Sequence, residues 1–342
     1  MILLEISTVK QLIIKLGIKK FFIRLVDNLQ EDFAHWPEFE KSSRHAIYVE
    51  NGVLELMPVC NKSLYSFKYV NGHPNNVDRK KLTVVALGML ADVTTGYPLL
   101  LSEMTLLTAI RTAATAALAS RYLAKANSKK LAIIGCGAQS EFQVLAHHAL
   151  FDLSEVHYFD LDERAMERFA QNLENESFKL IKGKSGRDVI KDADIIITAT
   201  AAAGKNHVLE YSWLQPGQHI CGIGGDSVGK TELDPQILKH SKIVVEYFPQ
   251  TVHEGEIQNL GEDAKKYVYA ELWQIVTKEK IGRENERELT VFDSVGFALE
   301  DFSVLRLVYE LAKQYQLGKK VDLIPESLSD CKNLFGLLKN II

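Results

Sequence analysis

The sequence predicts an α/β protein in which a Rossmann-type doubly wound parallel sheet is joined to an α+β domain with an antiparallel sheet. Two observations lead to this fold class. After Lys129, short apolar runs alternate with amphipathic segments, a rhythm typical of parallel sheets with crossover helices. Before it, about 100 residues show strand patterns separated by turn signals, as expected for an antiparallel sheet. We place the α+β domain at residues 1–122, joined by 316–342, and the Rossmann domain at 123–315.

Length and composition narrow the class of protein. A chain of 342 residues exceeds one ordinary core, and 46% hydrophobic and 25% charged residues are typical of globular proteins. The formal net charge of −4 provides no basic field for nucleic acid or an anionic membrane. The N-terminus lacks a basic n-region and meets a charge at Glu5, and the four cysteines show no metal or redox-motif spacing. We therefore expect a cytoplasmic protein without a nucleic-acid partner, a membrane partner or a metal site.

The first region begins with helices and continues as strands. Ser7 is placed to cap a helix starting at Thr8, and a second helical pattern runs from Gly17 to about Trp36. The Asn51-Gly52 pair is a strong hairpin signal between two apolar runs. Strands are expected at residues 45–49, 53–57, 64–70, 83–91 and 97–101.

A long helix is predicted over residues 103–123, and its many alanines allow close approach of another backbone. Arg111 is the long cation in its first half. The region 260–287 reads as helices and charged turns, residues 302–315 as a helix returning to the first domain, and the tail 318–342 is expected to pack there. The parallel strands are expected at 131–134, 155–159, 178–181, 195–198, 219–223, 243–245 and 290–292, with helices at 140–151 and 163–174.

The Gly135-Cys136-Gly137 turn follows an apolar strand and precedes a helical pattern. This arrangement places an anion at a helix N-terminus, where free N–H groups and the helix dipole favour it. The dinucleotide fingerprint is incomplete, because Ser140 occupies the third glycine position. Asp160 stands about 25 residues beyond Gly135, where a carboxylate accepts bonds from an adenosine ribose and repels a 2′-phosphate. NAD is thus favoured over NADP; the alternative is that Asp160 merely caps the next helix.

The segment 224–231 formally matches the phosphate loop G-x-x-x-x-G-K-T. We reject that interpretation, because Asp226 would face phosphates and the next helix signal comes only at Asp234-Pro235. The segment instead leaves a strand at its carboxyl end, where open α/β sheets bind ligands. We expect its two leading glycines to admit a nicotinamide and Asp226 to carry a proton. The alternative is a turn aspartate satisfied by backbone N–H groups.

Three cations and an acid of the first domain are candidates for holding an amino acid. Arg44, Lys68 and Arg111 suit a carboxylate, and Glu55 suits an ammonium group. Taken singly, each is more often an exposed surface side chain. The ten histidines form no recognisable metal pattern and are expected in packing or surface roles, and no G-x-S-x-G nucleophile motif occurs.

Five motifs in order resemble the ornithine cyclodeaminase/mu-crystallin family over nearly the whole chain. In two places the sequence departs from the family pattern: Cys136 replaces a usually polar residue, and Ser227-Val228 replaces a Cys-Pro pair next to Asp226. The motifs lie at residues 68–74, 103–115, 134–143, 224–233 and 292–301.

The resemblance implies conversion of L-ornithine to L-proline and ammonia, with NAD recycled in each turnover, in proline biosynthesis or in ornithine and arginine catabolism. It also implies a homodimer formed through the first domain. An NAD(P)H-dependent amino-acid dehydrogenase or ketimine reductase of the same family is an alternative. A crystallin-like binding protein without catalysis is another.

The resemblance also assigns roles to residues. Arg44, Lys68 and Arg111 hold the substrate carboxylate, Glu55 lies near its amino group, and Asp226 is the acid/base residue and contacts the substrate. The glycines Gly135, Gly137, Gly224 and Gly225 approach the cofactor, as argued above. Further cofactor contacts are implied at Thr83, Arg111, Ala138, Gln139, Asp160, Thr200, Ile223, Lys230 and Ser294.

Overall fold

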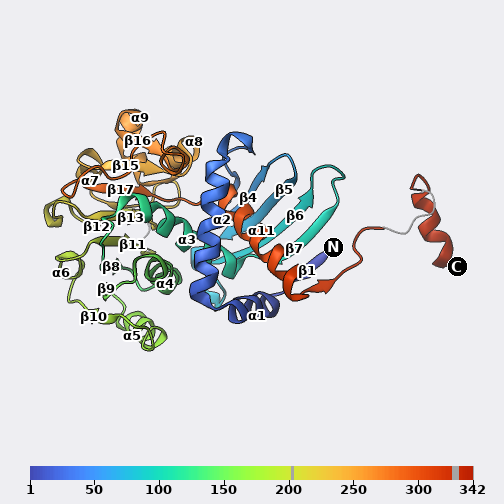
Figure 1. The fold of residues 1–342 in the computed structure, drawn as a ribbon, viewed down its shortest axis with the longest axis horizontal. Helices are drawn as coiled ribbons and strands as arrows, with labels where there is room; N and C mark the ends of the chain where they lie inside the picture. Colours follow the sequence, from blue (N-terminus) through green and yellow to red (C-terminus); the bar gives the residue numbers. More distant parts are fainter. Residues whose placement is uncertain (202–203, 326–330, 342) are drawn as a thin grey trace.

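The computed structural model describes residues 1–201, 204–325 and 331–341. Two eight-stranded sheets lie on either side of α3 (Thr105–Leu123), as Figure 1 shows, and a small two-stranded sheet accompanies the second. One large sheet is mostly antiparallel and the other is entirely parallel. The predicted α/β fold class is therefore confirmed.

The first sheet has the strand order β18-β1-β7-β6-β5-β4-β2, with β3 also paired to β4. The predicted hairpin is confirmed: Val49 pairs with Gly52, and Asn51 takes the left-handed φ of 59° that its turn requires. The strands are β1 (Ile2–Leu4), β2 (Glu40–Lys41), β3 (His45–Val49), β4 (Gly52–Cys60), β5 (Leu64–Gly72), β6 (Val84–Asp92), β7 (Pro98–Glu103) and β18 (Lys319–Lys320).

Helices α1 (Ile6–Leu16), α2 (Ile18–Ala34) and α11 (Ala298–Tyr315) accompany this sheet, and α11 packs against β4, β5 and β6. Phe21, Phe22 and Phe302 are fully buried in the core beneath them. The expected Ser7 cap is wrong. Helix α1 begins at Ile6, because the Glu5 carbonyl accepts its first backbone hydrogen bonds, and no side chain caps this end.

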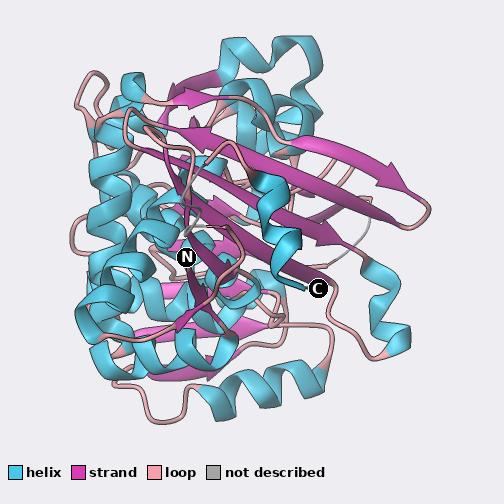
Figure 2. Cartoon of the chain, turned by 90° about the vertical axis from the view of Figure 1, so that its right-hand side faces the viewer, coloured by secondary structure: helices cyan, strands magenta, loops and turns pink. Residues whose placement is uncertain are grey.

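The C-terminal part of the chain divides between the first sheet and an isolated helix. Helix α11, which the predicted division assigns to the range 123–315, packs on the first sheet; the division itself stays a prediction. In the tail, β18 pairs with β1, as a returning segment should. Helix η5 (Leu334–Ile341) lies apart from the body in Figure 1 and in front of it in Figure 2, with Phe335 exposed. The expectation that the whole tail packs on the first domain is therefore wrong for η5.

The second sheet has the order β10-β9-β8-β11-β13-β17-β15-β16, with neighbours parallel throughout. Its predicted strands are confirmed within one or two residues, and α4 (Ser140–Phe151) and α5 (Glu163–Asn172) connect three of them. The strands are β8 (Lys130–Ile134), β9 (Glu155–Phe159), β10 (Lys179–Lys182), β11 (Ile195–Thr198), β13 (His219–Gly222), β15 (Lys242–Val245), β16 (Val268–Glu271) and β17 (Thr290–Asp293).

Six short strands of the described residues were not predicted: β1, β2 and β18 of the first sheet, β16 of the second, and the two strands of the small sheet. The edge strand β16 follows α9 (Ala264–Tyr267) directly, inside a region interpreted as helices and turns. The strands β12 (Lys205–Leu209) and β14 (Thr231–Leu233) form the small parallel sheet beside the large one. Each is too short for an alternation pattern to develop, so pairing rather than periodicity defines it.

The parallel arrangement positions the site. Because the strands of the second sheet run the same way, the loops after β8, β9, β11, β13 and β17 meet at one edge. Of the cofactor residues predicted above, all except Thr83 and Arg111 lie in these loops or at the start of the helix that follows one. Within the described residues, no helix is both long and apolar enough to cross a membrane.

Candidate active site

The two glycines of the turn after β8 serve different purposes. Gly135 has a φ of +103°, and a Cβ there would collide with the Ala199 carbonyl at the end of β11. A Cβ at Gly137 would meet nothing within 4 Å, so this position faces open space. Gly135 therefore allows the ends of β8 and β11 to lie close together, and Gly137 leaves room for a ligand.

Asp160 closes this turn. Its carboxylate accepts hydrogen bonds from the Cys136 backbone amide at 2.6 Å and from the Asp162 backbone amide at 2.9 Å. The alternative that Asp160 caps the next helix is wrong, because Asp162 caps α5 by accepting from the Arg164 amide. Asp160 is thus held at the end of β9, facing the glycine turn.

Cys136, which departs from the family pattern, is buried inside the turn. Burial, together with the negative charges of Asp160 and Glu141, raises the pKa of its thiol to about 12, so the thiol stays protonated. Nearby, the buried Oε1 of Gln139 has no hydrogen-bond partner in the described structure. An unused buried acceptor is costly unless a ligand donates to it, and Gln139 is one of the predicted cofactor contacts.

The segment 224–231 contains no helix, and β14 begins at Thr231, so the rejection of a phosphate loop is confirmed. The backbone amides of Ile223 and Gly224 both donate to the Thr198 carbonyl at the end of β11. A Cβ on Gly224 would collide with the Glu232 carboxyl group, and one on Gly225 with the Glu256 carboxyl group. The two glycines are therefore required by buried carboxyl groups of the chain, a reason that the sequence did not reveal.

These carboxyl groups belong to a carboxylate ladder formed by Asp293, Glu256 and Glu232, all of them buried. Asp293, at the end of β17, accepts from the first two backbone amides of η4 (Glu256–Asp263), each at 2.9 Å. Glu256 accepts from two adjacent amides of β14 at 2.8 and 3.0 Å. Glu232 accepts from the Thr200 amide at 2.8 Å. The ladder thus ties four segments together beneath the Asp226 loop.

Burial is the largest influence on the ladder's acidity. It raises the pKa of Glu232, and with the charge of Asp293 it raises the pKa of Glu256 well above its usual value. It raises the pKa of Asp293 to about 7. Raised pKa values favour the protonated, neutral form of these acids, which lessens the repulsion between them.

Asp226 sits half-exposed on the loop above the ladder, with 52% of its side chain accessible. Its Oδ1 pairs with Lys230 Nζ at 3.0 Å. Gln258 fixes the loop from below, because its Oε1 accepts from the Gly229 amide at 2.7 Å. An exposed pair of this kind is weak, so Asp226 remains available to a ligand while its backbone is held.

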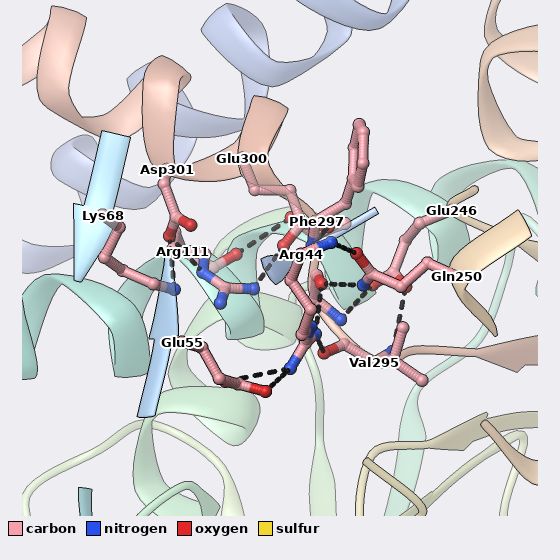
Figure 3. A network of polar contacts seen from close by, with 12 residues as sticks. Arg44, Glu55, Lys68, Arg111, Glu246, Gln250, Val295, Phe297, Glu300 and Asp301 are labelled. Atoms are coloured by element: carbon pink, nitrogen blue, oxygen red, sulfur yellow. Dashed lines mark hydrogen bonds and ion pairs between the residues drawn. The ribbon is translucent and has the colours of Figure 1, made fainter. Parts of the chain in front are cut away.

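Lys68 and Arg111 meet on one acid, as Figure 3 shows. Lys68 Nζ and Arg111 Nε both contact Asp301 Oδ1 at 2.9 Å, and Arg111 Nη1 contacts Glu300 at 2.6 Å. All of these side chains are buried, so the alternative of exposed surface charges is wrong for both cations. Burial, and then the charge of Arg111, lowers the pKa of Lys68 to about 8. Burial, and then the charge of Glu246, raises the pKa of Glu300 to about 8.

Arg44 bridges the two sheets. Its Nη1 contacts Glu55 on β4 at 3.2 Å, and its Nε contacts Glu254, at the end of α8 (Phe248–Glu254), at 3.1 Å. Its Nη2 donates to the carbonyls of Val295 and Gly296, just after β17, at 2.6 and 2.8 Å. Arg44 and Glu55, predicted separately, are thus brought together beside the edge of the second sheet.

The segment after β17 donates three hydrogen bonds to one buried acid, Glu246. Glu246 accepts from the Ser294 hydroxyl at 2.7 Å and from the amides of Val295 and Gly296 at 2.9 and 3.1 Å. Ser294 is therefore fixed in place, and the carbonyls that receive Arg44 are oriented by the same group. Thr83, by contrast, lies just before β6, where its carbonyl accepts from the His73 amide at 2.8 Å.

Sequence reasoning missed the acids that organise the site: Glu232, Glu246, Glu254, Glu256, Glu300 and Asp301. For two of these acids, the sequence contains a signal that could have indicated a buried, paired position. Glu300 and Asp301 stand inside the motif 292–301, on a helix start that is apolar on both sides, where unpaired acids are rare. Glu232 stands inside the motif 224–233, where nothing local marks it as buried, and the other three lie in segments without a recognisable pattern.

The histidines play structural roles where they are buried. His147 and His219 both contact the Ser120 hydroxyl, at 2.9 and 3.1 Å, and burial lowers the pKa of His147 to about 4. Their predicted packing role is confirmed. In the parts of the chain that the structure describes, no group of three or more His, Cys, Asp or Glu side chains is arranged to hold a metal ion.

The fold and this site define a class: two-domain proteins in which a dinucleotide-type parallel sheet presents its carboxyl edge to charged residues of a second, antiparallel sheet. Residues 7–316 match the profile of the ornithine cyclodeaminase/mu-crystallin family. The chain belongs to this family, as the motifs indicated.

Individual relatives extend this match over nearly the whole chain. An ornithine cyclodeaminase from Agrobacterium tumefaciens (strain Ach5) is 44% identical over 335 residues, covering 98% of this chain and 93% of the relative. A solved lysine cyclodeaminase, described as recognising L-lysine, L-ornithine and L-2,4-diaminobutyric acid, superimposes with a TM-score of 0.90 at 29% identity, covering 98% and 99% of the two chains. An archaeal alanine dehydrogenase dimer with bound NAD superimposes with a TM-score of 0.87 at 32% identity, covering 94% and 99%.

Proposed function

We propose that the chain is an NAD-dependent cyclodeaminase that converts L-ornithine to L-proline and ammonia. The observation that carries the proposal is the contact of Arg44 with both Glu55 of the first sheet and the segment after β17 of the second. It brings amino-acid-binding groups to the edge at which the Asp226 loop lies. The 44% identity to an ornithine cyclodeaminase over 98% of the chain supports the same activity.

NAD fits the carboxyl edge of the second sheet. The open position at Gly137, the unpartnered Gln139 acceptor and the carboxylate of Asp160 provide a turn, a hydrogen-bond acceptor and a ribose partner. The alanine dehydrogenase that superimposes on the chain has NAD bound. When bound, NAD supplies reversible hydride storage, so that the overall reaction is redox-neutral.

The chain's own residues bind and orient the substrate. Arg44, Lys68 and Arg111 hold its carboxylate, because buried guanidinium and ammonium groups form strong charge-assisted hydrogen bonds. Glu55 accepts from the α-ammonium group. Asp301 and Glu300 keep Lys68 and Arg111 in position before the substrate arrives.

Asp226 moves the protons. It takes a proton from the α-ammonium group, because the α-nitrogen must be neutral for its carbon to be oxidised to the imine level. The δ-amine of the same molecule then attacks that carbon and closes a five-membered ring. Asp226 returns a proton to the departing α-nitrogen, which leaves as ammonia. Holding the reacting atoms together contributes about 7–11 kcal/mol to such ring closures.

The test is one assay with two readouts. L-Ornithine with catalytic NAD should give proline and ammonia in equal amounts, without net absorbance from NADH. Asp226→Asn should lose turnover and keep NAD affinity. Full activity of this variant would remove Asp226 from the mechanism.

A second candidate is an amino-acid dehydrogenase, favoured by the superposition on alanine dehydrogenase. It predicts NADH formed in proportion to the substrate consumed. The same assay therefore separates the two activities, and an absence of any turnover would leave a binding protein.

We also propose that the protein forms a homodimer through the first sheet. Leu56, Tyr69 and Leu87 stand opposite one another on adjacent strands and are 39%, 39% and 50% exposed. A contiguous apolar row on a sheet face marks an interaction surface. The superimposed alanine dehydrogenase is itself a dimer.

A further inference from the structure

We infer that Glu254 binds the side-chain ammonium of the substrate and so selects diamino acids over monoamino acids. The inference rests on the proposed function, because it assigns a role to a further residue of the same site. It concerns a residue that neither the motifs nor the carried-over roles include.

Glu254 occupies a place that a structural salt bridge alone does not explain. It ends α8, its side chain is 9% exposed, and its Oε2 lies 3.1 Å from Arg44 Nε. Within the described residues, this Oε2 receives no well-aligned hydrogen bond. A buried carboxylate with one imperfect partner is costly unless a further cation approaches it.

The surroundings of Glu254 face the reacting centre. Its pKa is raised first by burial and further by the charges of Glu55 and Asp226, while Arg44 acts in the opposite direction. Glu254 is thus close enough for its pKa to be affected by Glu55, the predicted partner of the α-ammonium group, and by Asp226 on the proton-carrying loop. It lies on the second domain, whereas Glu55 lies on the first sheet.

The local charge balance favours a cationic ligand. Lys68 and Arg111 are matched by Asp301 and Glu300, and Lys230 is matched by Asp226. Among the described residues, Glu55 and Glu254 share Arg44 as their one ion-pair partner, which leaves one negative charge of this pair of acids in excess. A diamino acid carries one net positive charge at neutral pH, whereas a monoamino acid carries none. The second ammonium therefore supplies the missing charge.

Ring closure places this ammonium on the Glu254 side. The δ-nitrogen has to approach the carbon whose α-nitrogen exchanges protons with Asp226. Its acceptor must consequently lie near the Asp226 loop. Glu55 contacts Arg44 from β4 and suits the α-ammonium, so Glu254 is the acid left for the distal one.

The experiment compares two ligands on the NAD-loaded full-length protein. L-Norvaline has the carbon chain of ornithine without the δ-amine, and binding of both is measured by calorimetry or by displacement. Glu254→Gln should weaken ornithine binding about 10- to 100-fold, the loss expected for one charged hydrogen bond. Its norvaline affinity should change less than about twofold, because the excess negative charge has no partner in that ligand.

Glu55→Gln is the matched control, because Glu55 contacts the same guanidinium from the other side. This variant should weaken the binding of both ligands to a similar extent, since both carry the α-ammonium group. Glu254→Asp keeps the charge and should restore part of the preference for ornithine. Melting temperature and NAD affinity establish that each variant is folded.

The outcomes are separable from those of the proposed function. The role of Glu254 is overturned if Glu254→Gln loses affinity for ornithine and for norvaline equally, or if its ornithine affinity is unchanged. A wild-type protein without preference for ornithine overturns it as well. A wild-type protein that prefers ornithine in a Glu254-dependent way but releases no proline supports the inference and contradicts the cyclodeaminase proposal.

Discussion

Every nitrogen of the Arg44 guanidinium contacts a group of the chain itself. Two of these groups are carboxylates and two are backbone carbonyls, and they come from both sheets. Its position is therefore set before any ligand binds. Lys68 and Arg111 are likewise held by shared acids. A site built in this way loses little conformational freedom on binding, which favours affinity and alignment.

The lowered pKa of Lys68 predicts a pH limit on substrate binding. Because burial brings this pKa to about 8, Lys68 is charged below that pH and becomes neutral above it. Lys68→Met should lower kcat/KM roughly 10- to 100-fold at pH 7, the loss expected for one charged hydrogen bond. The ratio of wild-type to variant kcat/KM should fall as the pH rises past about 8. A ratio that stays constant through alkaline pH would contradict a role for the Lys68 charge.

Asp160 should determine the choice between NAD and NADP. Asp160→Ala removes the partner of the Cys136 amide and the charge that repels a 2′-phosphate. Affinity for NAD should fall, and the NAD-to-NADP preference should decrease at least roughly tenfold, because one charge–charge repulsion is removed. Fluorescence titration with both cofactors measures this ratio.

Asp162→Ala serves as the control for that experiment. It removes the cap of α5 two residues away, which costs about 1 kcal/mol of stability, without touching the turn after β8. If it changes the cofactor preference as strongly as Asp160→Ala, the effect comes from local stability and not from the Asp160 carboxylate.

At the scale of elements, the carboxylate ladder positions the loop that carries Asp226. The backbone amides of the short, irregular segments that it joins do not all pair with one another. They donate instead to the carboxyl groups of Asp293, Glu256 and Glu232. Gly224 and Gly225 pass directly over the last two of these acids. The loop therefore follows the ladder closely, although its own residues form little regular structure.

Gly225→Ala should misplace Asp226 without unfolding the protein. The added Cβ would collide with the Glu256 carboxyl group, so the loop must move outward. Turnover should fall roughly 10- to 100-fold, since a displacement of about 1 Å can have that effect. Steady-state kinetics measure the loss of turnover, and NAD titration measures how much of it comes from the cofactor contact expected of Gly225.

Gly229→Ala is the comparison within the same loop. Its Cβ meets nothing within 4 Å, although its φ of +81° disfavours a side chain by about 1–2 kcal/mol. A smaller loss of turnover than in Gly225→Ala is expected. Equal losses would attribute the effect to backbone strain instead of contact with the ladder.

At the scale of the whole molecule, the first sheet has an apolar row that its own helices leave uncovered. Leu87→Asp places a charge at one end of this row, opposite Tyr69. The variant should shift from dimer to monomer in light scattering, because a buried unpaired charge is strongly unfavourable at an interface. Leu161→Asp is the control, since Leu161 is 94% exposed and lies outside this sheet. A dimer that persists in Leu87→Asp would place the interface elsewhere.

The sequence by itself determined the order of the elements and the identity of the cofactor edge. Apolar runs such as residues 195–198 and the Asn51-Gly52 turn are local signals, and the structure has both where they were predicted. The glycine turn and Asp160 are also adjacent in a single βαβ unit, so their meeting follows from local connectivity. Such features depend on neighbouring residues, and neighbouring residues are what a sequence displays.

Only the tertiary structure decided which acids meet which cations. Arg44, just before β3, and Glu254, at the end of α8, are far apart in the chain, and so are Lys68 on β5 and Asp301 on α11. Nothing local distinguishes these acids from exposed ones, because their burial is created by the packing of α11 and the approach of the second sheet. Long-range ion pairs depend on how the layers pack together, and the spacing of residues along the chain does not predict that packing.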